Sequence, residues 1–159
     1  MRSADEKYMM MCLRLAVKGA GNVSPNPMVG CVIVKNGRVI GRGWHKRYGE
    51  AHAEVNAVAS ALKVVKDLRG SDEYVNLEPC AHKGKTGSCA RMLADMKPAR
   101  VITGCRDPYP PVNGRGIRML RNAGIEVKEG VLEEESMALN KFFMTFVKKM
   151  RPYVSLKVA

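Results

Sequence analysis

The Asn36-Gly37 pair is the sequence feature that most restricts the fold of this chain. Both residues tolerate positive φ angles, so together they favour the tight two-residue turn of a β-hairpin. The pair separates a nearly continuous apolar run over residues 28–35 from a second β-rich run over residues 38–44. The sequence therefore predicts two antiparallel strands joined by this turn.

The rest of the chain alternates strand patterns with helical patterns. Strands alternating with helices after an opening hairpin indicate an α/β layer fold with a mixed sheet and helices on both faces. In such a fold we expect active-site groups at strand ends. Helices are expected over residues 4–19, 51–62, 89–96, 116–122 and about 132–150, and further strands over residues 73–77, 100–104 and 125–130.

Length and cysteine usage indicate one cytoplasmic domain. A chain of 159 residues can bury a full core without disulfides, and its five cysteines are odd in number and irregularly spaced. The longest uncharged stretch, residues 19–34, contains two prolines and three glycines, so no segment is suited to span a membrane. Charged residues also interrupt the first segment before a signal peptide could form.

The net charge of +12 leaves two kinds of partner open. It is compatible with nucleic acid and equally with a phosphorylated small molecule. The sequence shows no basic strip interleaved with the aromatic residues that stack bases, so nucleic acid is the less favoured partner.

Three residues form a candidate metal site. His52 opens one predicted helix, Cys80 follows a strand, and Cys89 opens the next helix. Helix N-termini favour thiolate, and two sulfurs with one nitrogen suit tetrahedral Zn²⁺ with a fourth position open for water. Glu54, two residues from His52, could transfer protons without being a ligand, as in the His-x-Glu…Pro-Cys…Cys pattern of zinc deaminases. The alternative, a structural zinc, leaves Glu54 without a role.

Longer motifs carry a narrower resemblance. His52-Ala53-Glu54 and Glu78-Pro79-Cys80 resemble the cytidine-deaminase-like superfamily. Over almost its whole length the chain resembles the riboflavin-biosynthesis pyrimidine deaminases, with eight residues between the two cysteines, where tRNA, dCMP and cytidine deaminases have a tight Cys-x-x-Cys. The matching segments are residues 24–30, 41–45, 52–57, 77–86, 106–108 and 114–117.

This resemblance implies a fold, a reaction and partners. The fold would be a three-layer α/β/α arrangement around a mixed sheet of about five strands, with residues 1–150 as the deaminase domain. The reaction would be zinc-dependent hydrolysis of the ring amino group of 2,5-diamino-6-ribosylamino-4(3H)-pyrimidinone 5′-phosphate, with release of ammonia. Family members are often fused to a C-terminal reductase. Residues 151–159 resemble the first strand of that reductase domain. Deaminases of this fold generally assemble, so we expect a homodimer or larger oligomer.

The resemblance also assigns individual residues. It gives zinc to His52, Cys80 and Cys89 and proton transfer to Glu54. On the residues alone, His45 could instead cover the edge of the core, Lys85 could be a surface charge, and His82 is either a partner of a zinc ligand or a solvated loop residue. The positions that the resemblance places near the substrate are Asn26, His45, Lys85 and Asp107.

The chain departs from the family pattern in two places. Where the family commonly has Thr-Pro-Pro-Cys, this chain has Gly87 and Ser88 before Cys89, so the loop is expected to be more mobile. Where the family usually has Asp-Pro-Asn-Pro, Tyr109 replaces the small amide near the substrate. Two other functions stay open: a tRNA adenosine or other nucleotide deaminase, and a catalytically inactive, zinc-containing deaminase-like module.

Overall fold

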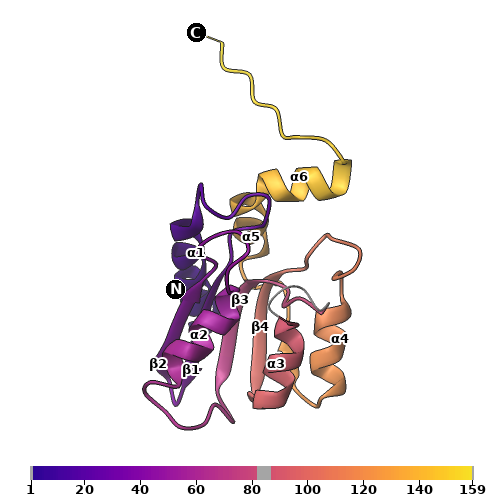
Figure 1. Cartoon of the computed structure of the whole chain (residues 1–159). Helices are drawn as coiled ribbons and strands as arrows, with labels where there is room; N and C mark the ends of the chain where they lie inside the picture. Colours follow the sequence, from indigo (N-terminus) through magenta and orange to yellow (C-terminus); the bar gives the residue numbers. More distant parts are fainter. Residues whose placement is uncertain (1, 82–86, 159) are drawn as a thin grey trace.

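A five-stranded mixed sheet forms the centre of the protein in a computed structural model that describes residues 2–81 and 87–158 (Figure 1). The strand order is β2-β1-β3-β4-β5. β1 pairs antiparallel with β2 and β3, whereas β3, β4 and β5 run parallel. The predicted mixed sheet is confirmed. The strands are β1 Gly30–Lys35, β2 Arg38–Trp44, β3 Asp72–Leu77, β4 Arg100–Cys105 and β5 Glu126–Lys128.

The predicted hairpin is also confirmed. Asn36 and Gly37 have φ angles of 52° and 72°, which are the positive values that this kind of turn requires. Lys35 then pairs with Arg38 directly across the turn.

Helices cover both faces of the sheet, as the three-layer prediction requires (Figure 1). α1 (Ala4–Ala16) and α5 (Glu133–Leu139) lie on one face, where α1 buries apolar side chains against β1 and β3. α2 (Ala53–Ala61), α3 (Cys89–Met96) and α4 (Arg115–Asn122) cover the other. A short 3₁₀ helix, η1 (Val17–Gly19), follows α1.

α2 lies in direct backbone contact with β2. A Cβ atom at Gly41 would lie 2.5 Å from the carbonyl oxygen of Ala57, and one at Gly43 would overlap the backbone of Ala53 and Ala57. Only glycine allows this approach. The contact fixes the start of α2, and with it His52 and Glu54, at the end of the hairpin.

The prediction of one helix over residues 132–150 is wrong. Two helices, α5 and α6 (Lys141–Lys149), are separated by Asn140, whose φ and ψ of −103° and 26° are not helical. The side chain of Asn140 hydrogen-bonds the backbone of Met28 in a distant loop, and this tertiary contact overrides the helical periodicity. α6 therefore lies across the end of the sheet (Figure 1).

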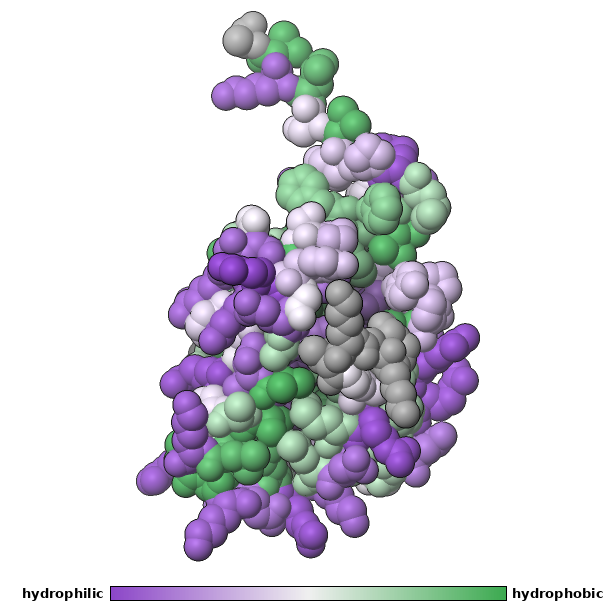
Figure 2. Space-filling view, in the orientation of Figure 1, coloured by the Kyte–Doolittle hydropathy of each residue, from purple (hydrophilic) through white to green (hydrophobic). Residues whose placement is uncertain are grey.

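The segment after α6 extends away from the body of the protein (Figure 1). Residues 151–158 have exposed side chains and form no strand, so the alternating pattern has no sheet to join within the described residues. Figure 2 shows apolar surface on α6 and this segment, where Phe142, Phe146 and Met150 are exposed. Among the described residues, no helix has the length and apolarity needed to cross a membrane.

The single tryptophan lies at the end of β2. Trp44 is half-buried, and the ammonium groups of Lys18 and Lys46 lie 4.9 and 5.2 Å from its ring centroid. These are cation–π distances. The next residue along the chain is His45, one of the residues expected near the substrate.

An unusual carboxyl group lies in the core. Glu73 on β3 is 2% exposed and accepts a hydrogen bond from the thiol of Cys31 at 3.3 Å. Burial, reinforced by the charge of Glu54, raises the pKa of Glu73 to about 8. The folded protein therefore holds this proton more tightly than the unfolded chain does.

We expect Glu73→Gln to remove a pH dependence of stability. Between about pH 5 and pH 8 the unfolded chain has lost the Glu73 proton while the folded protein keeps it, so folding stability falls as pH rises. The variant keeps an acceptor for Cys31, and its advantage over the wild type should grow by about 1.4 kcal/mol per pH unit across this range. Urea unfolding from pH 5 to pH 8 measures this, and parallel stability curves would contradict it.

Candidate active site

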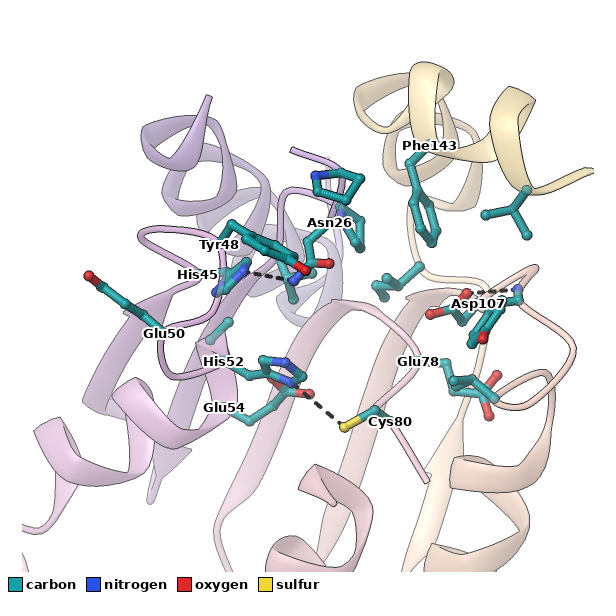
Figure 3. Close-up of a pocket in the computed structure, with 18 of the residues that line it drawn as sticks. Asn26, His45, Tyr48, Glu50, His52, Glu54, Glu78, Cys80, Asp107 and Phe143 are labelled. Atoms are coloured by element: carbon teal, nitrogen blue, oxygen red, sulfur yellow. Dashed lines mark hydrogen bonds between the residues drawn. The ribbon is translucent and has the colours of Figure 1, made fainter. Parts of the chain in front are cut away.

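Three side chains from separate elements, His52, Cys80 and Cys89, meet at one end of the sheet, and Figure 3 shows the first two of them. His52 immediately precedes α2 in extended backbone, and Cys89 is the first residue of α3. Cys80 follows β3 after the Glu78-Pro79 turn. The sequence expectation that these residues lie at strand ends and helix starts is met, and their candidate ligand atoms lie within 4.8 Å of one another.

The spacing of these atoms fits zinc. The Nδ1 atom of His52 lies 3.6 Å from Sγ of Cys80 and 3.4 Å from Sγ of Cys89. Tetrahedral Zn²⁺, with bonds of about 2.05 Å to nitrogen and 2.3 Å to sulfur, separates such atoms by about 3.6 Å. Hydrogen bonds from Cys89 and His52 hold the pKa of the Cys80 thiol well below its ordinary value, so this thiol is readily a thiolate. The donor set and its geometry therefore suit the metal.

Glu54 lies beside this cluster in the first turn of α2. Its side chain is 3% exposed, and burial together with the nearby charge of Cys80 raises its pKa to about 7. A carboxyl group with a pKa near neutrality can both accept and release a proton at working pH.

The start of α3 holds Cys80 in place. The Ser88 hydroxyl donates to the carbonyl oxygen of Cys80 at 2.9 Å and accepts from the backbone N–H of Arg91, so Ser88 caps the helix and fixes the ligand loop. The N–H of Cys89 also donates to Sγ of Cys80 at 3.4 Å. Gly87 has a φ of +80°, which proline cannot adopt. The two family prolines are thus replaced by a left-handed glycine and a helix cap.

Glu78 has a structural task that the sequence did not reveal. Its carboxylate accepts hydrogen bonds from the backbone N–H groups of Gly114, Gly116 and Ile117 at 2.9 to 3.3 Å, at the start of α4. A Cβ atom at Gly116 would overlap the carbonyl oxygen of Pro79. Glu78 therefore binds the N-terminus of α4 to the turn that carries Cys80.

A cavity of about 480 Å³ opens above the cluster. His52, Glu54 and Cys80 form its floor, and α6 provides an apolar roof that includes Phe143 (Figure 3). Its other lining side chains include Asn26, His45, Tyr48 and Glu50 on one side, Asp107, Tyr109 and Val112 on the other, and Phe146 and Val147 in the roof.

Asn26 and His45 form a hydrogen-bonded chain with defined direction. Nδ1 of His45 lies 3.1 Å from the carbonyl oxygen of Ala51, which can only accept, so Nδ1 carries a proton. Burial lowers the pKa of His45, and its neutral ring leaves Nε2 as an acceptor. Asn26 Nδ2, at 3.2 Å, therefore donates to Nε2. The side-chain oxygen of Asn26 is then directed away from His45, toward the cavity.

The remaining predicted residues are only partly placed. Asp107 lines the cavity, and one of its carboxylate oxygens accepts from the N–H of Tyr109 at 2.8 Å. Lys85 and His82 lie outside the described residues. Among the described residues that line the cavity there is no lysine or arginine, so an anionic ligand group would need a cation from elsewhere.

Sequence reasoning missed several residues around the cavity. Tyr48 and Glu50 carried no motif of their own. Phe143 and Phe146 lie in an apolar run of helical period, and such a period does not show that a helix closes a pocket. The isolated Asn140 within an apolar run was the available signal for a helix break.

Comparison with known families gives a direct match. Residues 2–105 match the family described as the cytidine and deoxycytidylate deaminase zinc-binding region. The Riboflavin biosynthesis protein RibD of Bacillus amyloliquefaciens is 47% identical over 98% of this chain and 41% of that protein. The diaminohydroxyphosphoribosylamino-pyrimidine deaminase of Buchnera aphidicola subsp. Schizaphis graminum is 45% identical over 92% of this chain and 96% of that protein.

A solved structure agrees with these matches. The crystal structure of a diaminohydroxyphosphoribosylaminopyrimidine deaminase/5-amino-6-(5-phosphoribosylamino)uracil reductase from Thermotoga maritima superposes with a TM-score of 0.91 at 48% identity, covering 94% of this chain and 43% of that one. The chain thus spans about two fifths of the length of the RibD relatives that it matches.

The fold, the His-Cys-Cys cluster and the family match define a zinc-dependent deaminase of the cytidine and deoxycytidylate deaminase family. Within it, the chain belongs to the diaminohydroxyphosphoribosylaminopyrimidine deaminases of riboflavin biosynthesis.

We expect replacement of a sulfur ligand to abolish zinc retention. Cys89→Ser should lower bound zinc from one equivalent to near zero after dialysis, because a hydroxyl is a far poorer zinc ligand than a thiolate. Cys105→Ser, at a buried cysteine outside the cluster, is the matched control and should retain the metal. Elemental analysis gives the ratio, and full retention by Cys89→Ser would contradict the ligand set.

Ser88→Ala should weaken zinc binding while leaving the ligands intact. Loss of the bond to the Cys80 carbonyl frees the ligand loop, and such supporting contacts typically contribute about tenfold or more to metal affinity. Ser88→Thr keeps the hydroxyl and should bind zinc nearly as the wild type does. Chelator competition measures the affinities, and equal values for the alanine and threonine variants would argue against this role.

Proposed function

We propose that this protein hydrolyses the ring amino group of 2,5-diamino-6-ribosylamino-4(3H)-pyrimidinone 5′-phosphate and releases ammonia. The observation that carries the proposal is the buried carboxyl of Glu54 beside the three zinc-ligand atoms, at the floor of a cavity large enough for a nucleotide-sized ligand. The proposal is also supported by the relatives, whose names specify this deamination.

The proposed reaction replaces an amino group by an oxygen. Zinc held by His52, Cys80 and Cys89 would supply Lewis acidity that makes water a nucleophile at neutral pH. Glu54 takes a proton as the water oxygen bonds to the ring carbon, and protonates the ring nitrogen beside it. The proton left on the new hydroxyl then passes through Glu54 to the amino group, so that the carbonyl forms as the carbon–nitrogen bond breaks. One water is consumed, and one carbonyl and one ammonia are formed.

The walls of the cavity would orient the substrate. The side-chain oxygen of Asn26, directed by His45, would accept a hydrogen bond from an N–H or O–H of the ligand. Asp107 would accept from ribose hydroxyls, and Tyr109 would pack beside it in place of the family amide. By the family resemblance we assign Lys85 to the phosphate or a carbonyl group of the substrate, and His82 to the support of a zinc ligand.

We further propose how the chain is organised. Residues 1–150 would carry the deaminase activity, and residues 151–159 would begin the first strand of a reductase domain, fused or supplied as a separate partner. The extended, alternating tail and the greater length of the RibD relatives support this. Exposed Phe142 and Phe146 on α6 support a homodimer or larger oligomer. Among the described residues the five cysteines form no disulfide, which supports a cytoplasmic location.

Ammonia release by zinc-loaded protein tests the reaction. The wild type should release one ammonia per molecule of the pyrimidine phosphate, and Glu54→Gln should be slower by at least about 100-fold, since proton transfer by a positioned group contributes that much. Glu126→Gln, an exposed substitution on β5, is the matched control and should keep full activity.

The outcomes separate the alternatives. Full zinc with no ammonia release by the wild type would refute the proposed substrate and make a tRNA adenosine or another nucleotide the next one to test. Unchanged activity in Glu54→Gln would refute the proton-transfer role.

A further inference from the structure

One buried amide joins the C-terminal helices to the loop that carries Asn26. Asn140 lies between α5 and α6 and is only 3% exposed. Its Oδ1 accepts from the backbone N–H of Met28 at 2.8 Å, and its Nδ2 donates to the Met28 carbonyl oxygen at 2.9 Å. Both polar groups of the side chain are satisfied by one residue 112 positions away. A buried amide paired in this way has little freedom to reorient.

Each end of this contact leads to a wall of the cavity. Met28 is two residues from Asn26, whose side chain faces the cavity from the side of His45 (Figure 3). The carbonyl oxygen of Asn140 accepts from the N–H of Met144, so the same residue begins α6. One turn later Phe143 projects into the cavity roof (Figure 3). The Asn140–Met28 contact therefore sets the separation between the polar wall and the apolar roof.

The two walls belong to different parts of the chain. The match to the general deaminase family ends at residue 105 and contains the zinc ligands, Glu54 and Asn26. Asp107, Tyr109 and the roof residues of α6 lie beyond it. The zinc site is held by α2, α3 and the β3 loop without help from Asn140. A change at Asn140 can consequently alter the shape of the cavity while the metal cluster stays intact.

We propose that Asn140 is a positioning residue that assembles the substrate pocket by fixing the Asn26 loop against the aromatic roof of α6. It contributes to substrate binding through Asn26 and Phe143, and contributes neither to zinc binding nor to proton transfer. This inference rests on the proposed function for the identity of the substrate, and on the structure alone for the coupling of the two walls.

Steady-state ammonia release and zinc content of full-length Asn140→Ala test this role. We expect KM for the pyrimidine phosphate to rise about tenfold or more, because two part-buried hydrogen bonds that hold the wall are lost. kcat should stay within about threefold, and one equivalent of zinc should be retained. Asn140→Asp keeps the acceptor for Met28 N–H but sets a second carboxylate oxygen against the Met28 carbonyl, so its KM should rise as well.

A core variant distinguishes positioning from general destabilisation. Ile125→Val lies in the core cluster shared with α3 and α4, outside the residues that line the cavity, and should lower the melting temperature with KM unchanged. An Asn140→Ala KM within twofold of the wild type, or a rise in KM matched by Ile125→Val, would overturn the proposal. A fall in kcat or zinc content with unchanged KM would overturn it as well.

Amide hydrogen exchange tests the coupling without any substrate. In zinc-loaded wild type the Met28 N–H should be protected, and the NMR signals of the Asn26 side-chain amide should be sharp. Asn140→Ala should speed exchange at Met28 and shift the Asn26 signals, whereas the His52 signals should stay in place. If the wild type released no ammonia, only the proposed function would fail. Unchanged exchange at Met28 and unshifted Asn26 signals in the variant would refute the positioning role.

Discussion

The backbone contact between α2 and β2 determines where the chemistry of this protein takes place. Because Gly41 and Gly43 present no side chains, the helix lies directly on the strand, and its first turn is held at the end of the sheet. His52 and Glu54 therefore arrive beside the turn that follows β3. The Ser88 hydroxyl, at the start of α3, donates to the Cys80 carbonyl oxygen. This contact places the sulfur of Cys89, the first residue of α3, beside the sulfur of Cys80. The metal cluster is thus a consequence of two helix starts meeting over one strand end.

The three buried glutamates show how differently one side chain is accommodated. Glu78 accepts hydrogen bonds from three backbone N–H groups at the start of α4. Glu73 has the thiol of Cys31 as its hydrogen-bond donor and keeps its proton well above the ordinary pKa. Glu54 lies beside the candidate ligands, where a bound cation would stabilise its charged form. Burial raises the pKa of both Glu54 and Glu73, and of these two only Glu54 lies beside the candidate zinc ligands.

Much of this arrangement could be predicted from sequence, because it depends on local rules. The turn at Asn36-Gly37 and the strand and helix periods follow from short-range preferences, and the His52, Cys80 and Cys89 pattern has a specific chemical meaning. Asn140 was a weak local signal for the helix break, and the contact that produces the break was not readable from sequence, because its partner Met28 is 112 residues away. The roof formed by Phe143 depends on that break. Likewise, the role of Glu78 needs α4 to lie beside it, which is a tertiary fact.

The position of Trp44 gives the protein a spectroscopic marker in the core beneath α1. The indole is the only one in the chain, and two ammonium groups flank it. The backbone carbonyl oxygen of Trp44 accepts a hydrogen bond from the side chain of Asn56 on α2. The adjoining His45 completes the polar wall of the cavity. Tryptophan emission depends on nearby charge and on exposure to water, so loosening of the core around α1 changes the intrinsic fluorescence. The integrity of this layer can therefore be followed optically, without a label and without turnover.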